Sequence, residues 1–295
     1  MTALRIMLLG VALTLLPHDA LAQWAHQPTN AQVLVDCAFT AGQCTNQGML
    51  DYSVNAPLPY TNDVSAPISP SGVGVSRLIY PNTSGGSQWG YYANAVIRSL
   101  YVGLEWRTNS GFTGNNVGQN KTFFMRGNGY GNTPFNAGVF ILTKDKNASS
   151  GVLTWHQNTG GLDNGHVCPP SPGSICFPNL TATPIVVGQW YKLEAIVTAS
   201  TCNTCRDGRI ELWVNDVKNF DLQNFNYGGG NVNEFIWTET WDGVSAGAGF
   251  LATAEHYFDH LRVAAVNCSP NCGSGERDTT PPGQVTNLTV SQLTR

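Results

Sequence analysis

The feature that most constrains this chain of 295 residues is a period of two in its hydrophobicity. Alternating apolar and polar residues are typical of β-strands that have one face in a core and the other outside it. The clearest alternating runs span 33–39, 95–107, 120–126, 137–144, 151–157, 190–199, 209–215 and 255–265. No run of twelve or more residues combines a 3.6-residue apolar stripe with a capping residue at each end, as a helix would require. The pattern therefore predicts an all-β chain.

The segments between the runs are rich in turn-forming residues. Glycine, asparagine, proline and serine cluster there, most densely over 108–119 and 158–184. Because the strands follow one another without intervening helices, a parallel βαβ architecture is excluded. Many strands in one large unit favour a two-sheet antiparallel jelly-roll sandwich of the all-β class.

Alternation also assigns faces to three of the runs. The predicted core side chains are Leu100, Val102, Leu104, Trp106, Tyr191, Leu193, Ala195, Val197, Ile210, Leu212 and Val214. The predicted outward side chains include Tyr101, Glu105, Arg107, Lys192, Glu194, Glu211 and Trp213. An outward tryptophan among charged neighbours is a candidate contact for a ligand.

Residues 1–22 have the three parts of a secretory signal peptide: an early positive charge, a short apolar run and a final Ala-Leu-Ala. The apolar run over 6–16 is too short to cross a bilayer, and no later stretch predicts a membrane span. We therefore expect a secreted protein, extracellular or periplasmic, with its jelly-roll domain over 23–266.

The eight cysteines form four close pairs, which are Cys37/Cys44, Cys168/Cys176, Cys202/Cys205 and Cys268/Cys272. An even number of cysteines in an oxidising compartment predicts disulfides, and pairing within each close pair is the simplest arrangement. The alternatives are a zinc site built from the pairs at 202–205 and 268–272, and thioredoxin-like chemistry at 202–205.

The C-terminal part differs in composition from the rest. Residues 267–280 are small and polar, as in a linker, and contain one of the cysteine pairs. Residues 281–295 begin with two prolines and continue with alternating apolar residues, which suggests the first strand of a second, truncated β domain.

Charge excludes one class of partner. Lys plus Arg number 15 against 19 Asp plus Glu, and charged residues make up 12% of the chain. This balance gives no basic field, so we expect no nucleic-acid partner.

Three stretches together resemble the concanavalin A-like lectin/glucanase superfamily, in its laminin-G-like and polysaccharide-lyase-like branches. They are GQWYKLEAIVTAS…DGRIELWVND at 188–216, WTETWDGVSAG at 237–247 and YFDHLRVA at 257–264. The resemblance implies a jelly roll whose concave sheet meets carbohydrate. Separately, DTTPPGQVTNLTVS at 278–291 is similar to the start of a fibronectin type III domain, as found in multimodular extracellular proteins.

Recognition of sugars uses aromatic faces for the apolar side of the ring and planar polar groups for its hydroxyls. The predicted ligand-binding residues are Tyr101, Arg107, His156, Glu194 and Trp213. We expect them to bind a polysaccharide or glycan without catalysis. A structural or adhesive surface protein with a protein partner is a further alternative.

The competing enzyme hypothesis is a polysaccharide lyase that acts on an acidic glycan. Such a lyase needs a group that neutralises the uronate, a base and an acid, which His156, Tyr101, Arg107 and Lys121 would supply if their strands are neighbours. Glycoside hydrolysis is disfavoured because the superfamily's alternating carboxylates, E-x-D-x-x-E, are absent.

Metal and cofactor signals are weak. The loops are compatible with structural calcium, but no EF-hand-like motif occurs, so we expect no cofactor and assign no metal site. His256 and His260 lie four residues apart on a predicted strand, which would place both on one face about 13 Å apart. We interpret them as surface or interface histidines.

Overall fold

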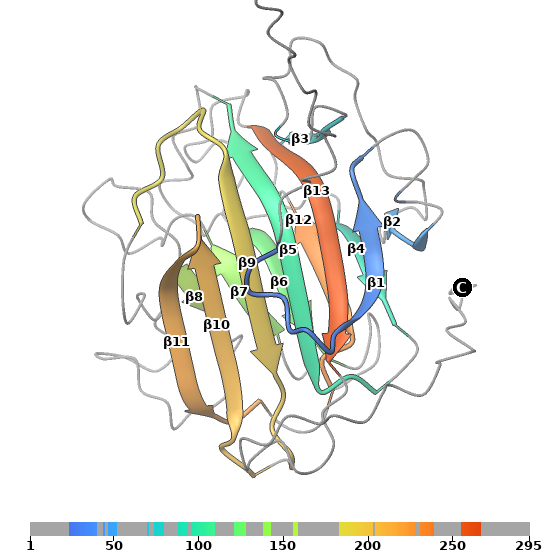
Figure 1. Cartoon of the computed structure of the whole chain (residues 1–295), viewed down its shortest axis with the longest axis vertical. Coiled ribbons are helices and arrows are strands. Elements are labelled where there is room, and N and C mark those ends of the chain that lie inside the picture. Colours follow the sequence, from blue (N-terminus) through green and yellow to red (C-terminus); the bar gives the residue numbers. More distant parts are fainter. Residues whose placement is uncertain are drawn as a thin grey trace, which may run out of the picture.

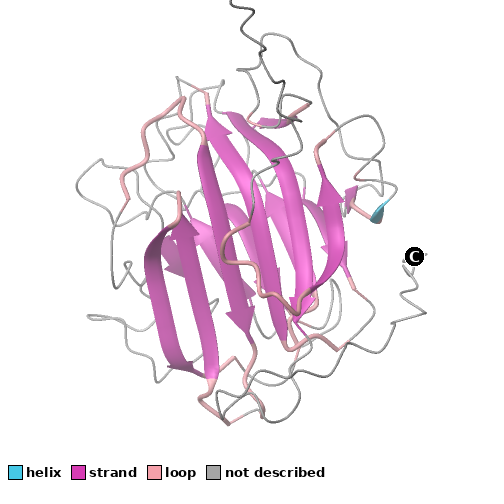
Figure 2. Ribbon diagram, in the orientation of Figure 1, coloured by secondary structure: helices cyan, strands magenta, loops and turns pink. Residues whose placement is uncertain are grey.

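Two antiparallel sheets make up the computed structural model of the chain (Figure 1). The structure describes residues 24–39, 44, 47–51, 70, 74–79, 88–93, 96–109, 121–127, 138–142, 156–158, 183–202, 204–227, 231–238 and 255–266. Within these ranges the regular elements are all strands, apart from a 3₁₀ turn at Gln47 (Figure 2). The described part of the chain contains no helix long and apolar enough to cross a membrane. The prediction of an all-β jelly-roll sandwich is confirmed.

The larger sheet has seven strands and lies at the front of Figure 1. In spatial order it contains β1 (Gln32–Cys37), β13 (Glu255–Val266), β5 (Ser99–Thr108), β9 (Tyr191–Thr198), β10 (Gly208–Val214) and β11 (Val217–Phe225). The seventh strand, β3 (Ser76–Ile79), pairs with the beginning of β13. The first and last of these strands in sequence are therefore neighbours at one side of the sheet.

The smaller sheet has six strands and lies behind the first. Its order is β2 (Leu50–Asp51), β4 (Gln88–Tyr92), β12 (Glu234–Thr238), β6 (Lys121–Arg126), β7 (Gly138–Leu142) and β8 (His156–Asn158). The central strand β12 pairs with both β4 and β6, and the three strands are antiparallel.

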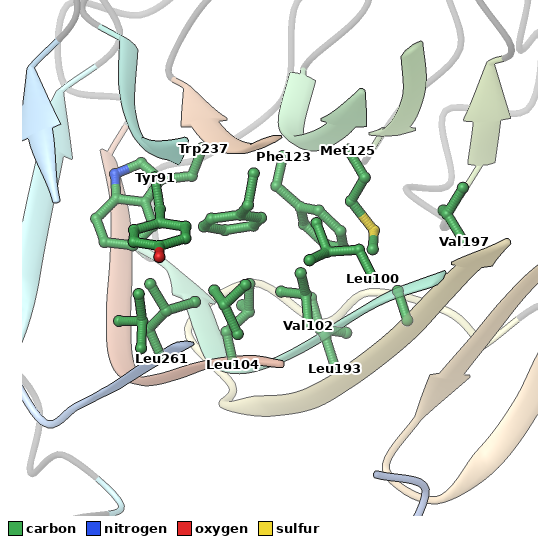
Figure 3. Packing of buried hydrophobic residues seen from close by; sticks show 14 of the residues in the cluster. Tyr91, Leu100, Val102, Leu104, Phe123, Met125, Leu193, Val197, Trp237 and Leu261 are labelled. Carbon is green, nitrogen blue, oxygen red and sulfur yellow. The ribbon is translucent and has the colours of Figure 1, made fainter. Parts of the chain in front are cut away.

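The hydrophobic core lies between the two sheets (Figure 3). Trp237, Phe123 and Met125 project from the smaller sheet toward aliphatic side chains of β5, β9 and β13, among them Leu104 and Leu193. The core side chains predicted for 98–106, 190–198 and 209–215 are all buried in this cluster. The period of two therefore assigned the faces of these strands correctly.

Two of the predicted cysteine pairs are disulfides. Cys37 bonds to Cys44 and Cys202 to Cys205, so each bond closes a short loop and joins no distant parts of the fold. Because both sulfurs of the 202–205 pair are bonded to each other, they are not thiolate ligands, and the zinc site expected from this pair as an alternative is wrong.

The other sequence predictions at the cysteines and termini lie outside the described residues. The disulfides expected between Cys168 and Cys176 and between Cys268 and Cys272 are not among the bonds of the described part, so these two pairings stay predictions. The signal peptide over 1–22, the linker over 267–280 and the fibronectin-like segment over 281–295 lie outside it as well.

Candidate functional site

The outer face of the seven-stranded sheet is the side turned away from the core, and it carries charged and aromatic side chains. β5 directs Tyr101, Gly103, Glu105 and Arg107 to this face, because Leu100, Val102, Leu104 and Trp106 alternate with them in the core. Strand register then places Glu105 opposite Asp259 of β13 and Lys192 of β9. This face is where the sequence predicts ligand binding.

A segment at the N-terminal end, residues 24–31, lies across this face; we call it the N-terminal segment. In Figure 1 it is the dark blue trace that crosses β9, β5 and β13 before it continues into β1. The indole of Trp24 rests on Gly103, where an added Cβ would lie 2.8 Å from the ring. Only glycine leaves room for this close approach. Trp24 itself is 8% exposed and packs in a small cluster with Tyr101 and Ala264.

Three of the five predicted ligand-binding residues lie beneath or beside the N-terminal segment. Tyr101, Glu194 and Trp213 point outward as predicted, yet they are only 0%, 1% and 8% exposed. The imidazole of His26 stacks on the Trp213 ring with centroids 4.4 Å apart, and the His26 backbone N–H donates to Glu194 Oε2 at 2.9 Å. These three side chains are therefore not open to solvent, because the N-terminal segment covers them.

His156 and Lys121 belong to the other sheet. His156 begins β8 and Lys121 begins β6, whereas Tyr101 and Arg107 lie on β5 in the seven-stranded sheet. The two sheets are separated by the core, so the condition that these strands are neighbours is not met. The structure brings Tyr101, Arg107, Glu194 and Trp213 to one face without His156.

The structure also corrects the expectation that His256 and His260 lie on one face of a strand. They do not share a face, because a β-bulge between Asp259 and Leu261 shifts the register and His260 has a φ of 41°. Neither is a surface residue. His256 is fully buried, accepts a hydrogen bond from Trp106 Nε1 at 3.3 Å, and has its pKa held well below the usual value by burial.

His260 lies on the outer face beside the N-terminal segment. Its Nε2 is 2.8 Å from Asp36 Oδ1, and its ring meets the indole of Trp24 edge-on at 5.3 Å. Hydrogen bonds from His260 and Arg262 hold the pKa of Asp36 below its usual value. Arg262 also donates to Gln27 Oε1 at 2.6 Å, so the same arginine fixes the N-terminal segment.

Arg107 lies at the end of the outer face beyond these contacts. Its Nε is buried and donates no hydrogen bond, and the described residues provide it with no ion-pair partner. Burial lowers the pKa of this guanidinium, although arginine stays charged at neutral pH. Arg107 therefore has an unused donor and, within the described part of the chain, no carboxylate partner.

Tyr257 is the cross-strand neighbour of Arg107 in the β5–β13 pairing. Its hydroxyl donates to Glu255, which also forms an ion pair with Arg77. Arg77 thus has a carboxylate partner, whereas Arg107 has none among the residues that the structure describes. A half-buried arginine beside a phenol is a suitable pair for holding a carboxylate, because the guanidinium presents several donors in a planar fork.

Two carboxylates lie next to this pair. Glu105 and Asp259 face each other across β5 and β13 and are 8% and 0% exposed. Burial and the charge of Asp259 raise the pKa of Glu105 from 4.5 to about 7. A carboxyl group with such a pKa can hold a proton at neutral pH, as a general acid must.

This raised pKa predicts a pH-dependent stability. Because folded Glu105 keeps its proton up to about pH 7 whereas the unfolded side chain ionises near 4.5, its contribution is fully present below pH 4.5 and is lost as the pH rises through 7. The difference amounts to roughly 3 kcal/mol. Urea unfolding of wild type and Glu105→Gln between pH 4 and 8 tests this, and Glu105→Gln should remove that decline.

Asp259→Asn is the matched variant. It removes the charge of Asp259, one of the causes that raise the pKa of Glu105, so the loss of stability should end at a lower pH than in the wild type. Equal pH profiles for wild type and Glu105→Gln would contradict the assignment.

Two other cations on this face, Arg209 and Lys218, have carboxylate partners. Arg209 Nε donates to Asp221 Oδ1 at 2.7 Å, and Lys218 Nζ donates to Glu211 Oε1 at 2.7 Å while lying 4.8 Å from the Trp213 ring centroid. Hydrogen bonds from Arg209 and Lys218 lower the pKa of Asp221 to about 2. Arg209 and Lys218 thus differ from Arg107, for which the described residues provide no carboxylate.

One group of side chains has the chemistry of metal ligands. His26, Glu194 and Asp216 each offer an atom within 4.8 Å of the other two. Sequence reasoning missed this group because its members come from distant parts of the chain.

The comparisons with known proteins identify the fold. No protein-family model matches the sequence, and no curated protein matches it. The chain is similar to the solved structure of a variant of the alginate lyase Aly36B in complex with alginate trisaccharide, at 14% identity over 80% of this chain and 98% of that chain, with a TM-score of 0.54. It is also similar to the PL-14 alginate lyase from Aplysia kurodai, at 9% identity over 80% of this chain and 100% of that chain, again with a TM-score of 0.54. At these identities the likeness shows a shared jelly-roll architecture.

Proposed function

We propose that this protein binds an acidic polysaccharide, a polymer that contains uronic acids, at the Arg107 end of the outer face. The observation that carries the proposal is the Arg107 guanidinium, whose buried Nε has no hydrogen-bond acceptor. A uronate carboxylate supplies acceptor oxygens and a negative charge to this half-buried guanidinium. Tyr257 beside it offers an aromatic face for the sugar ring.

Two further points support an acidic ligand. The fold is shared with alginate lyases, one of which was solved in complex with an alginate trisaccharide, and alginate is a polyuronate. The chain has a net charge of -4, so recognition of a polyanion needs a local positive site such as Arg107 rather than a general positive field.

The test is retention of the purified chain in gels that contain alginate or, as the neutral arm, a glucan of similar size. We expect retention by alginate, and Arg107→Gln should weaken it roughly tenfold to a hundredfold, because a hydrogen bond to a charged group is lost. Arg206→Gln makes the same charge change on an exposed loop residue and should leave retention near wild type. No retention by alginate, or equal retention of both variants, would refute the proposal.

A polysaccharide lyase is the second candidate function. It is favoured by the position of Tyr257 next to Arg107 and by a Glu105 that can hold a proton at neutral pH. In this mechanism Arg107 would neutralise the uronate, and Tyr257 would replace His156 as the group that exchanges protons with the sugar. A new absorbance near 235 nm on incubation with alginate would establish elimination, and Tyr257→Phe should abolish it.

Tyr101, Glu194 and Trp213 remain predicted ligand contacts under this proposal. Because the N-terminal segment covers them, a sugar could reach them only after this segment moves. The primary binding position is therefore assigned to Arg107 and Tyr257.

A further inference from the structure

Two buried polar atoms without hydrogen bonds point into the same space between the N-terminal segment and the outer face. They are Oε1 of Glu194 and Nε2 of His26. Glu194 is 1% exposed, so leaving one of its oxygens without a hydrogen bond is costly. Buried polar atoms in native proteins nearly always have a partner, which indicates that this space accommodates a ligand.

A third potential ligand completes the group. Asp216 lies in the two-residue turn between β10 and β11, where Asn215 and Asp216 adopt φ values of 50° and 65°. Positive φ at both positions is the geometry of a tight hairpin turn. This turn brings the Asp216 carboxylate to 3.7 Å from His26 Nε2. The three ligand atoms lie within 4.8 Å of one another and come from the N-terminal segment, β9 and the hairpin turn.

Surrounding groups orient two of the three ligands. Glu194 Oε2 accepts hydrogen bonds from the Tyr101 hydroxyl at 2.7 Å and from the His26 backbone N–H, which leaves Oε1 directed at the site. The His26 ring is held flat against Trp213, with an interplanar angle of 8°. Such outer contacts are typical of metal sites, where they fix the direction of the ligands.

The ammonium of Lys192 shows that this space favours a cation. Its Nζ lies 2.5 Å from Asp216 Oδ1 and 3.7 Å from Glu194 Oε1. The ammonium satisfies Asp216 but leaves Glu194 Oε1 and His26 Nε2 without hydrogen bonds. Lysine is long and flexible, and its side chain here is 16% exposed, so it can swing into solvent. Asp216 is 55% exposed, so its carboxylate can move closer to the other two ligands.

We propose that His26, Glu194 and Asp216 bind one zinc ion, which displaces the ammonium of Lys192 and fastens the N-terminal segment to the outer face. One imidazole nitrogen and two carboxylate oxygens suit zinc, which takes such ligands at about 2.0–2.2 Å. Calcium prefers six to eight oxygen ligands, and this site offers a nitrogen and few oxygens. The proposal does not depend on the binding of a sugar at Arg107 and Tyr257.

The test is calorimetric titration of the purified, chelator-treated chain with zinc chloride, together with thermal unfolding with and without zinc. We expect one zinc ion per chain and a higher unfolding midpoint in zinc, since a ligand that binds only the folded state stabilises it. His26→Gln should weaken zinc binding by at least about tenfold.

Two substitutions of Lys192 test the competition between its ammonium and the zinc ion. Lys192→Met removes the competing ammonium and should tighten zinc binding roughly tenfold, whereas Lys192→Arg keeps the positive charge and should not. Both act on a partly exposed side chain, so both proteins should fold.

Three results would overturn the proposal: no zinc binding by the wild type, zinc binding that His26→Gln leaves unchanged, or an affinity that Lys192→Met does not raise. Preference for calcium chloride over zinc chloride in the same titration would do so as well. Alginate retention of the His26 and Lys192 variants is measured separately. A failure of zinc binding can then be told apart from a failure of alginate binding at Arg107.

Discussion

Trp237→Ala should lower the free energy of unfolding by about 3–5 kcal/mol, one of the largest losses that a single substitution can cause in this fold. The Trp237 side chain is fully buried in the core between the two sheets. Its ring stacks on Phe258 at 5.1 Å with an interplanar angle of 9° and meets Phe39 and Phe235 edge-on. Truncation removes these contacts and leaves a cavity between the two sheets.

Urea unfolding of Trp237→Ala against wild type measures this loss. Val96→Ala is the matched control because Val96 is 78% exposed, and it should change stability by less than about 0.5 kcal/mol. A loss below about 1 kcal/mol for Trp237→Ala would mean that this side chain does not hold the sheets together.

Arg126→Met should cost about 3–5 kcal/mol for a different reason. Arg126 and Glu234 are cross-strand neighbours on β6 and β12, with side chains 5% and 0% exposed. The guanidinium forms an ion pair with Glu234 through Nε, and Nη2 donates a second hydrogen bond at 3.3 Å. Removal of the arginine leaves a buried carboxylate without its counter-charge.

The double variant Arg126→Met with Glu234→Leu separates the loss of attraction from the cost of an unpaired charge. It should recover most of the stability, because an apolar pair of similar volume replaces both charges. Arg209→Met, which breaks the partly exposed pair with Asp221, should cost less than about 1 kcal/mol. A double variant that is as unstable as Arg126→Met would show that the charges themselves contribute the stability.

The parts of the fold that the sequence predicted are those where one strand face is apolar and the other polar. β5, β9 and β10 alternate clearly, so the period of two alone identified their core side chains. β12 was missed because its sequence does not alternate: Phe235 and Trp237 point into the core, but Ile236 between them is apolar as well and is buried on the other side. A strand with apolar residues on both faces has no alternation to detect.

β11 was missed for the opposite reason. It is an edge strand with many polar residues, and its pairing with β10 contains two register irregularities, which break the period of two. The bulge at His260 likewise moved His260 off the face predicted for His256. Period-based reasoning cannot detect an inserted residue, because the insertion reverses every assignment beyond it.

The candidate site was predicted in part. Strand alternation correctly sent Tyr101, Arg107, Glu194 and Trp213 to one face, but it could not show that residues 24–31 return to cover three of them. That cover depends on contacts such as His26 with Glu194, which are 168 positions apart in sequence. Gly103 was the available signal, since a glycine in the middle of a strand often marks a close approach by another part of the chain.

The position of β13 has a consequence for biosynthesis. This strand is the last of the described strands to be made, yet it lies between β1 and β5 and bonds to both. Until residues 255–266 emerge, β1 has no described neighbour in the larger sheet and β5 keeps one open edge, which is a template for mispairing with other chains. Completion of the sheet must therefore await the far end of the domain, and a ribosome that stalls before position 255 would release an aggregation-prone product.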